Sequence, residues 1–139
     1  MATSTSFRLS EAARRCLASR AVRDGLTVTE LLEQLIVEGV DQREHPGVVF
    51  RGPSHDRRAG LAGGPDVWEI VARLQELDGR EEARIEVFAA ESELHPRQIR
   101  LALDYAAEHS DPVRRRIDRN RELSEHSRAI AEQRAALLS

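Results

Sequence analysis

The chain has 139 residues, of which 32% are charged and only 4% are aromatic, and its formal net charge is −3. A core of this composition must be built from Leu, Val, Ile and Ala, which argues against an aromatic-rich β-sandwich and favours a mainly α fold. Because no apolar run is long enough to span a membrane and the first residues do not resemble a signal peptide, we expect a cytoplasmic protein with no membrane partner.

Charge is spread unevenly along the chain. All 21 basic residues are arginine, so each cationic contact is made by a guanidinium group that can hold a phosphate or a carboxylate with two parallel hydrogen bonds. Residues 45–110 carry eight Arg and twelve acidic residues, whereas residues 111–139 carry seven Arg and five acidic residues. The middle is therefore acidic and the end mildly basic, and we divide the chain into regions 1–43, 45–110 and 111–139.

Region 1–43 is predicted to begin with a short strand and a helix. In residues 5–9, Phe7 and Leu9 alternate with polar residues, which is the pattern of a strand with one apolar face. Ser10 is placed to cap a helix that runs from residue 11 to about residue 23, and Gly25 can end that helix in a left-handed conformation. Cys16 falls on the apolar face of this helix, so we expect its thiol to be buried and unreactive.

A second helix is predicted to follow directly. Thr27 and Glu30 have the spacing of a capping box, and apolar periodicity continues from there to about residue 40. The apolar positions of this helix repeat at helical spacing and predict a buried stripe. They are Leu31, Leu32, Leu35, Ile36 and Val40.

One strand and two helices cannot close a core, and a lone strand leaves its backbone groups unpaired. We therefore expect this region to fold as a homodimer, or as a higher even oligomer. Each copy would supply one strand of a two-stranded antiparallel ribbon.

This order of elements resembles the ribbon-helix-helix family of repressors. The likeness rests on residues 6–11 and 24–32. Members of the family insert their paired strands into the major groove of DNA and hold a phosphate at the start of the second helix. The resemblance therefore implies operator DNA as a partner, contacted by outward strand residues and by the start of the second helix. The two groups are Ser4, Ser6 and Arg8 on the strand, and Thr27, Val28 and Thr29 on the helix.

Region 45–110 is predicted to contain a β-hairpin and three helices. The strands are expected at 48–51 and 57–61, and the helices at 67–77, 80–90 and 96–109. Arg57 and Arg58 are expected to be exposed and to keep the hairpin edge soluble. The last two helices, joined by a short turn, have a helix-turn-helix outline.

The same region resembles a small helix-turn-helix-like domain of antitoxins of the VapB type. The likeness rests on residues 45–51, 57–59, 64–71, 95–99 and 102–103. It implies, as a partner, a toxin related to the PIN-domain ribonucleases. The excess of acidic residues favours a packing platform or a second dimer interface over DNA contact. If the domain does contact DNA, the residues expected to do so are Arg97, Gln98 and Arg100.

Region 111–139 is predicted to be an arginine-rich helix with Pro112 at its first position. Its apolar stripe is thin, so the isolated helix should be marginally stable or disordered. Either it is a solvated helix, or it becomes ordered in the groove of a partner. The antitoxin resemblance implies that this partner is the PIN-like ribonuclease, whose carboxylate-lined metal site an arginine would enter. The candidate toxin-binding residues are Arg121, Leu123, Arg128, Ile130 and Arg134.

Signals for catalysis are weak. The five histidines do not pair with one another, or with the lone cysteine, at metal-ligand spacing. The chain has no glycine-rich phosphate loop and no Ser-His-Asp context. We therefore expect no enzymatic activity, no catalytic residue, no metal site and no cofactor.

The sequence thus predicts a mainly α protein. It comprises a ribbon-helix-helix unit with an intermolecular ribbon, a small β-hairpin and helix-turn-helix-like domain, and a C-terminal helical segment. The function predicted is that of a type II antitoxin, a dimeric DNA-binding autorepressor that also neutralises a PIN-like ribonuclease. The alternatives are a free-standing ribbon-helix-helix transcriptional regulator without a toxin partner, and an assembly module that never binds DNA.

Overall fold

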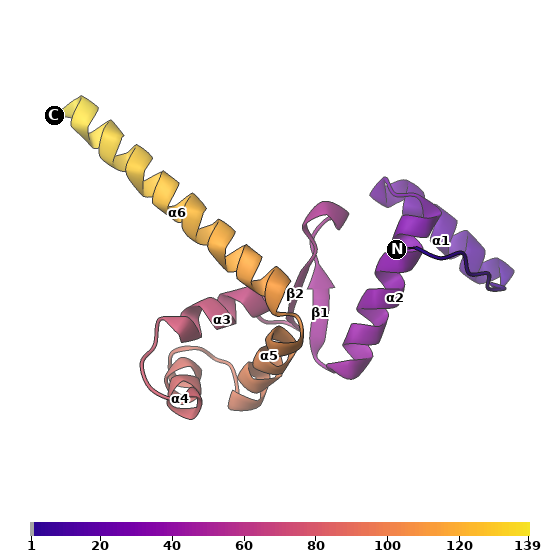
Figure 1. Ribbon diagram of the computed structural model, residues 1–139, viewed down its shortest axis with the longest axis horizontal. Helices are drawn as coiled ribbons and strands as arrows, with labels where there is room; N and C mark the ends of the chain where they lie inside the picture. Colours follow the sequence, from indigo (N-terminus) through magenta and orange to yellow (C-terminus); the bar gives the residue numbers. More distant parts are fainter. Residues whose placement is uncertain (1) are drawn as a thin grey trace.

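The computed structural model describes residues 2–139, a mainly helical chain with one small two-stranded antiparallel sheet. Figure 1 shows an elongated arrangement, with helices α1 and α2 at one end and the long helix α6 projecting at the other. Between them lies a body formed by the sheet and by helices α3, α4 and α5.

The N-terminal helices begin where their capping residues predicted, and α1 also ends close to its predicted limit. Helix α1 spans Glu11–Asp24; the Ser10 hydroxyl accepts a hydrogen bond from the Ala13 N–H at 3.1 Å, and Gly25 ends the helix at φ +67°. Helix α2 spans Val28–Glu44, and the Thr27 hydroxyl accepts from the Glu30 N–H at 3.1 Å. It runs about one turn further than predicted and ends at His45, whose N–H donates to the Asp41 carbonyl.

Residues 2–10 form no strand in the single chain. Phe7 is 79% exposed and Leu9 is also exposed, so neither side chain is buried against the helices of its own chain. The predicted strand lacks a pairing partner here, because the single sheet of the described residues is formed by the later hairpin.

Two predictions about burial in this region are wrong for the single chain. Helix α1 covers only the first turns of α2, where Leu17, Ala21 and Leu31 form a small core. Beyond that contact, most of the predicted apolar stripe of α2 is exposed to solvent. Leu32 is half-buried, whereas the remaining positions are exposed: Leu35, Ile36 and Val40. Cys16, expected to be buried, is also exposed, because nothing packs on that side of α1.

The sheet is the predicted hairpin. Strand β1 spans Val48–Arg51 and pairs antiparallel with β2, Arg58–Leu61, in the register Val48 opposite Leu61. A short 3-10 turn, Ser54–Asp56, lies within the connection. Gly52 has φ +96°, and a Cβ there would lie 2.5 Å from the Asp56 carbonyl oxygen, so the turn requires glycine.

Three helices complete the body close to their predicted limits. They are α3 (Val67–Gln75), α4 (Glu81–Glu91) and α5 (Pro96–Glu108). Pro96 is the first residue of α5, as predicted, and the His95 N–H donates to Oε1 of Gln98 at 2.8 Å. Helix α3 packs against both α5 and α6.

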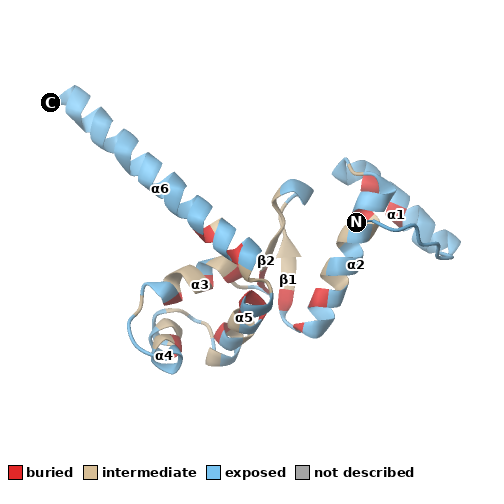
Figure 2. Cartoon of the chain, viewed as in Figure 1, coloured by how far each residue is buried: buried red, intermediate tan, exposed pale blue. Residues whose placement is uncertain are grey.

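Helix α6 spans Ser110–Leu138, and its two ends differ in environment. Val113 and Ile117, near its start, are buried in the main core together with Ile70 and Ile99. The later residues are exposed, as the pale blue far end of α6 in Figure 2 shows. Pro112 is the third residue of the helix rather than its first, because the turn begins at Ser110.

Within residues 2–139, no helix combines the length and the apolar character that a membrane span requires.

Candidate functional site

The predicted DNA-binding residues lie on two separate exposed elements. Ser4, Ser6 and Arg8 belong to the irregular segment before α1. Thr27, Val28 and Thr29 surround the exposed start of α2, where the Thr27 hydroxyl caps the helix. Backbone amides at a helix start carry partial positive charge and favour an anion. The single chain therefore presents both groups to solvent.

The apolar face of α2 is the largest unexplained apolar feature of this end. It consists of Val28, Leu35, Ile36 and Val40, all of them exposed. Their spacing places them on one side of the helix, next to the small α1–α2 core. Soluble proteins rarely leave such a continuous apolar surface open unless another molecule covers it. The face is therefore a candidate interaction surface.

The far end of α6 is the second exposed element. Arg121 donates a hydrogen bond to Oε1 of Gln75 in α3 at 2.7 Å. We call residues 122–138, which follow this contact, the outer half of α6. Every one of these residues is exposed, including four predicted toxin-binding residues. The four are Leu123, Arg128, Ile130 and Arg134. Of the five toxin-binding candidates, Arg121 thus contacts its own chain and the others extend into solvent.

A groove of about 700 Å³ separates α2 from the hairpin and from the start of α6. Arginines line much of it, but acidic groups oppose most of them. Arg57 donates from Nε to the Glu38 carboxylate in α2 at 3.0 Å, which ties the hairpin to that helix. Arg57 and Arg58, expected to be exposed on the hairpin, are instead half-buried. These ion pairs give the groove a structural role rather than a free cationic surface.

Asp56 is the acidic centre of this groove. Arg116 hydrogen-bonds to its carboxylate, and Arg119 lies 3.5 Å from it. The Arg116 hydrogen bond holds the pKa of Asp56 below its ordinary value of 3.8, although desolvation opposes the shift. The charges of Arg116, Arg119 and Arg58 lower this pKa further. Asp56 therefore stabilises the contact between the hairpin turn and α6 in its ionised form.

Substitution Asp56→Asn should destabilise the protein only at pH values at which the Asp56 carboxylate of the wild-type protein is ionised. Because the pKa of the folded state lies below that of the unfolded state, the stabilisation is complete above about pH 3.8 and is lost as the pH falls through the lowered folded value. Urea unfolding across that range should show the variant less stable near neutral pH and equal to wild type in acid. Asp118→Asn, an exposed change on α6, is the control. A difference that persists in acid would contradict this role.

A buried carboxylate fixes the hairpin to the start of α3. Asp66 accepts hydrogen bonds from Nε of Arg58 at 2.7 Å and from Nε1 of Trp68 at 3.2 Å. Its other oxygen lies 2.9 Å from Nε of Arg51. Arg51 also donates to the carbonyl oxygens of Leu61 and Gly64. This network ties both strands of the hairpin to the start of α3 and engages these two arginines within the body.

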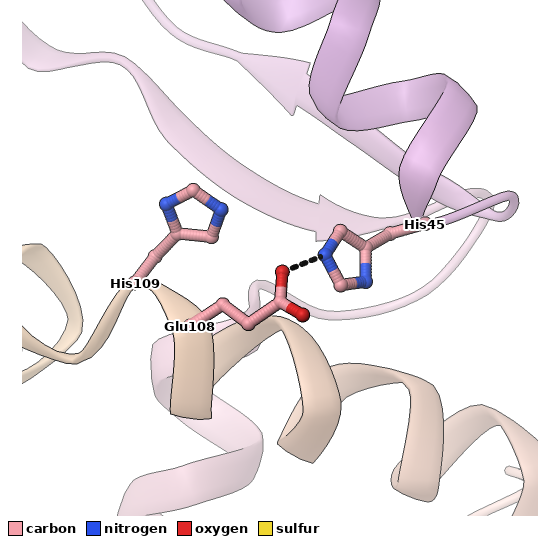
Figure 3. A group of neighbouring side chains, drawn as sticks. All are labelled: His45, Glu108 and His109. Atoms are coloured by element: carbon pink, nitrogen blue, oxygen red, sulfur yellow. Dashed lines mark hydrogen bonds and ion pairs between the residues drawn. The ribbon is translucent and has the colours of Figure 1, made fainter.

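A cluster of histidine and carboxylate groups joins the end of α2 to the end of α5. Figure 3 shows Glu108 and His109, at the end of α5, beside His45, at the end of α2. Nε2 of His45 lies 2.8 Å from Oε2 of Glu108, and Nε2 of His109 lies 3.7 Å from Oδ1 of Asp41. One ligand atom each from His45, Glu108 and His109 lies within 4.8 Å of the others.

Tyr105 forms one wall of this cluster. Its ring stacks on His109 at 4.3 Å between centroids and meets the edge of His45 at 5.4 Å. Burial raises the pKa of Tyr105 to about 12, and the charges of Asp41 and Glu38 add to the shift. The phenol therefore stays protonated near neutral pH and supplies an aromatic wall rather than an anionic ligand.

The cluster brings together two histidines that have no metal-ligand spacing in the sequence. His45 and Glu108 are 63 positions apart, and only the packing of α5 against the hairpin brings them into contact. The sequence contains one weak signal, the adjacent pair Glu108 and His109 at a helix end. Nothing local connects that pair to His45.

No protein family, no curated protein and no solved structure matches this chain.

Proposed function

We propose that the chain is a type II antitoxin. In this proposal two copies pair through residues 2–10 and the apolar face of α2, the paired strands contact operator DNA, and the outer half of α6 binds and neutralises a ribonuclease related to the PIN-domain toxins. The observation that carries the proposal is the exposure of an apolar, strand-patterned segment directly before two well-capped helices. That arrangement is what one half of a ribbon-helix-helix dimer would present.

Two independent features support the pairing. Phe7 and Leu9 alternate with polar residues, yet neither is buried by its own chain. The apolar face of α2 is open at the same end of the molecule, where the small core buries only Leu17, Ala21 and Leu31. A second copy that adds its own strand would satisfy the backbone groups of residues 2–10 and cover both apolar surfaces.

DNA contact is supported by the exposed polar residues before α1 and by the exposed start of α2. In a paired ribbon the side chains of Ser4, Ser6 and Arg8 would lie on the face opposite to Phe7 and Leu9. Arg8 is the strongest candidate, because a guanidinium that holds a guanine edge is the commonest specific contact in the major groove. The uncovered start of α2 near Thr27 suits a phosphate.

Substitution Arg8→Ala tests the ribbon directly. We expect it to weaken binding to the promoter of the chain's own gene by a few-fold to about 100-fold, which corresponds to about 1–3 kcal/mol for one good base contact. Quantitative gel-shift measurements at fixed salt would give this ratio. Binding of the wild-type protein should also weaken steeply as salt rises, because released counterions drive phosphate contacts.

Arg97→Ala is the matched control for that measurement. Arg97 is an exposed arginine on α5, the helix that would contact DNA if the helix-turn-helix-like region did so. We expect its substitution to leave operator binding unchanged. Loss of binding with Arg97→Ala and not with Arg8→Ala would assign DNA contact to α5 and refute the ribbon. Absence of salt-dependent operator binding in the wild-type protein would favour an assembly module.

The toxin-binding half of the proposal rests on α6. Its outer half is a helix without tertiary contacts after Arg121, and helices of this kind are marginal in water unless a partner covers their apolar positions. Leu123 and Ile130 lie seven residues apart among arginines, which suits a groove that is apolar at its base and acidic at its rim. The ribonuclease would be the product of a neighbouring gene, and the absence of such a gene would favour the free-standing regulator.

A further inference from the structure

The cluster of His45, Glu108 and His109 has the chemistry of a metal site. We propose that these three side chains, with Asp41 beside them, bind one zinc ion that joins the end of α2 to the junction of α5 and α6. This inference stands apart from the proposed antitoxin function, because it depends on the cluster alone.

The geometry supports a single shared ion. One ligand atom from each of the three residues lies within 4.8 Å of the others, and Nε2 of His45 lies only 2.8 Å from Oε2 of Glu108. In a tetrahedral zinc site, neighbouring ligand atoms are about 3.3 Å apart, since each lies about 2.0–2.1 Å from the metal. The cluster therefore needs a contraction of about 1.5 Å at its widest separation. Glu108, whose side chain is 61% exposed, has room to adjust its rotamer.

The ligand types and charges favour zinc over a hard cation. Two imidazoles and one carboxylate are the protein ligands of many open zinc sites, whereas calcium and magnesium prefer oxygen ligands alone. Asp41 lies 3.7 Å from Nε2 of His109 and is itself buried. It belongs to the polar surroundings of the site, and a water molecule would complete the tetrahedral coordination. With neutral imidazoles, the two carboxylates balance the charge of a divalent ion.

The environment of His45 supports the same conclusion. Its side chain is only 7% exposed, yet the carboxylate opposite it is largely open to solvent. Because a carboxylate can only accept hydrogen bonds, Nε2 of His45 carries the proton in this pair. Binding of zinc would replace that proton, which leaves to solvent. An ion pair alone would account for the contact between His45 and Glu108. It would not account for the presence of His109 and Asp41 next to that contact.

The position of the cluster suggests what the metal would do. His45 follows α2, which carries the N-terminal apolar surface, whereas Glu108 and His109 lie where α5 meets the long α6. A bound ion would fix the N-terminal helices relative to the body and to the start of α6. Zinc would thereby stabilise this arrangement of the full chain.

The test is a metal titration of the purified full-length protein. Zinc, followed by competition with a chromophoric chelator, and cobalt, followed by its visible absorption, should each show one ion per chain, and the cobalt spectrum should be that of a tetrahedral site. Zinc at about 100 times its dissociation constant should raise the thermal midpoint by roughly 5–10 °C. Glu108→Gln and His109→Asn should each weaken binding by about 100-fold or more.

His126→Asn, which changes an exposed histidine in the outer half of α6, should leave the titration unchanged. Glu108→Gln retains an oxygen that can accept from His45, so this variant should keep the fold, as circular dichroism of the metal-free protein would confirm. No binding at micromolar zinc, or binding that both cluster variants preserve, would overturn the proposal. Because operator binding by the metal-free protein is measured separately, failure here leaves the antitoxin proposal untouched.

Discussion

Ile36→Asp is expected to abolish the proposed pairing of two copies. Ile36 lies at the centre of the apolar face of α2 and is 52% exposed in the single chain. If a second copy covers that face, the substitution places a charge in an apolar interface, at a cost of several kcal/mol. The dimer dissociation constant should then rise by more than about 100-fold, which sedimentation equilibrium would measure.

The matched control for this prediction is Val87→Asp. Val87 is 46% exposed on α4, far along the chain from the proposed interface, so it tests the general effect of an acidic residue at an exposed apolar position. This variant should remain dimeric. Ile36→Asp should also lose operator binding, because the ribbon requires two strands. A wild-type protein that is monomeric and folded at micromolar concentration, or an Ile36→Asp variant that stays dimeric, would refute the pairing.

Ile117→Ala and Ile130→Ala should differ sharply although both remove the same side-chain atoms from α6. Ile117 is buried in the main core, so its truncation should cost about 2–5 kcal/mol of unfolding free energy. Ile130 is 41% exposed in the single chain, so its truncation should change stability by about 0.5 kcal/mol or less. Urea denaturation of both variants measures the difference. Equal destabilisation would mean that the outer half of α6 packs on the body.

The same pair separates stability from partner binding. Under the antitoxin proposal, Ile130→Asp and a chain that ends at Arg121 should bind operator DNA like the full-length protein. Both should fail to inhibit the proposed ribonuclease partner. Ile117→Ala, compared at a temperature where it is folded, should still inhibit it. Inhibition by the chain that ends at Arg121 would exclude the outer half of α6 as the inhibitory element, and would leave the DNA-binding proposal standing.

Local signals in the sequence were sufficient to place most secondary structure. Ser10, Thr27 and Pro96 begin helices as predicted, and Gly25 ends one. Each acts within a single turn: the two hydroxyls accept hydrogen bonds from free backbone N–H groups, proline has no N–H to leave unpaired, and glycine adopts the left-handed conformation. The hairpin follows for a similar reason, since its connection depends on the conformation of Gly52. The limits that shifted, such as the end of α2 at Glu44, lie where tertiary contacts extend a helix beyond its apolar periodicity.

Burial was harder to predict, because periodicity identifies an apolar face without showing what covers it. Leu31 and Ile36 belong to the same stripe of α2, yet only Leu31 contacts the small core with α1. Ile117 and Ile130 differ in the same way along α6. In both helices the packing covers only some of the apolar residues, which is why the exposed ones became candidate interaction surfaces.

By itself, the sequence determined the order of the helices and of the hairpin from residue 11 onward, most of the capping residues and the mainly α class, since these depend on interactions between residues a few positions apart. The strand predicted at residues 5–9 does not form in the single chain. Only the tertiary structure decided which apolar residues are covered, that Arg57 and Asp56 hold α2 and α6 to the hairpin, and that His45 meets Glu108 and His109. Those contacts join residues that are distant in the chain. Their formation depends on how whole elements pack, and no local pattern encodes it.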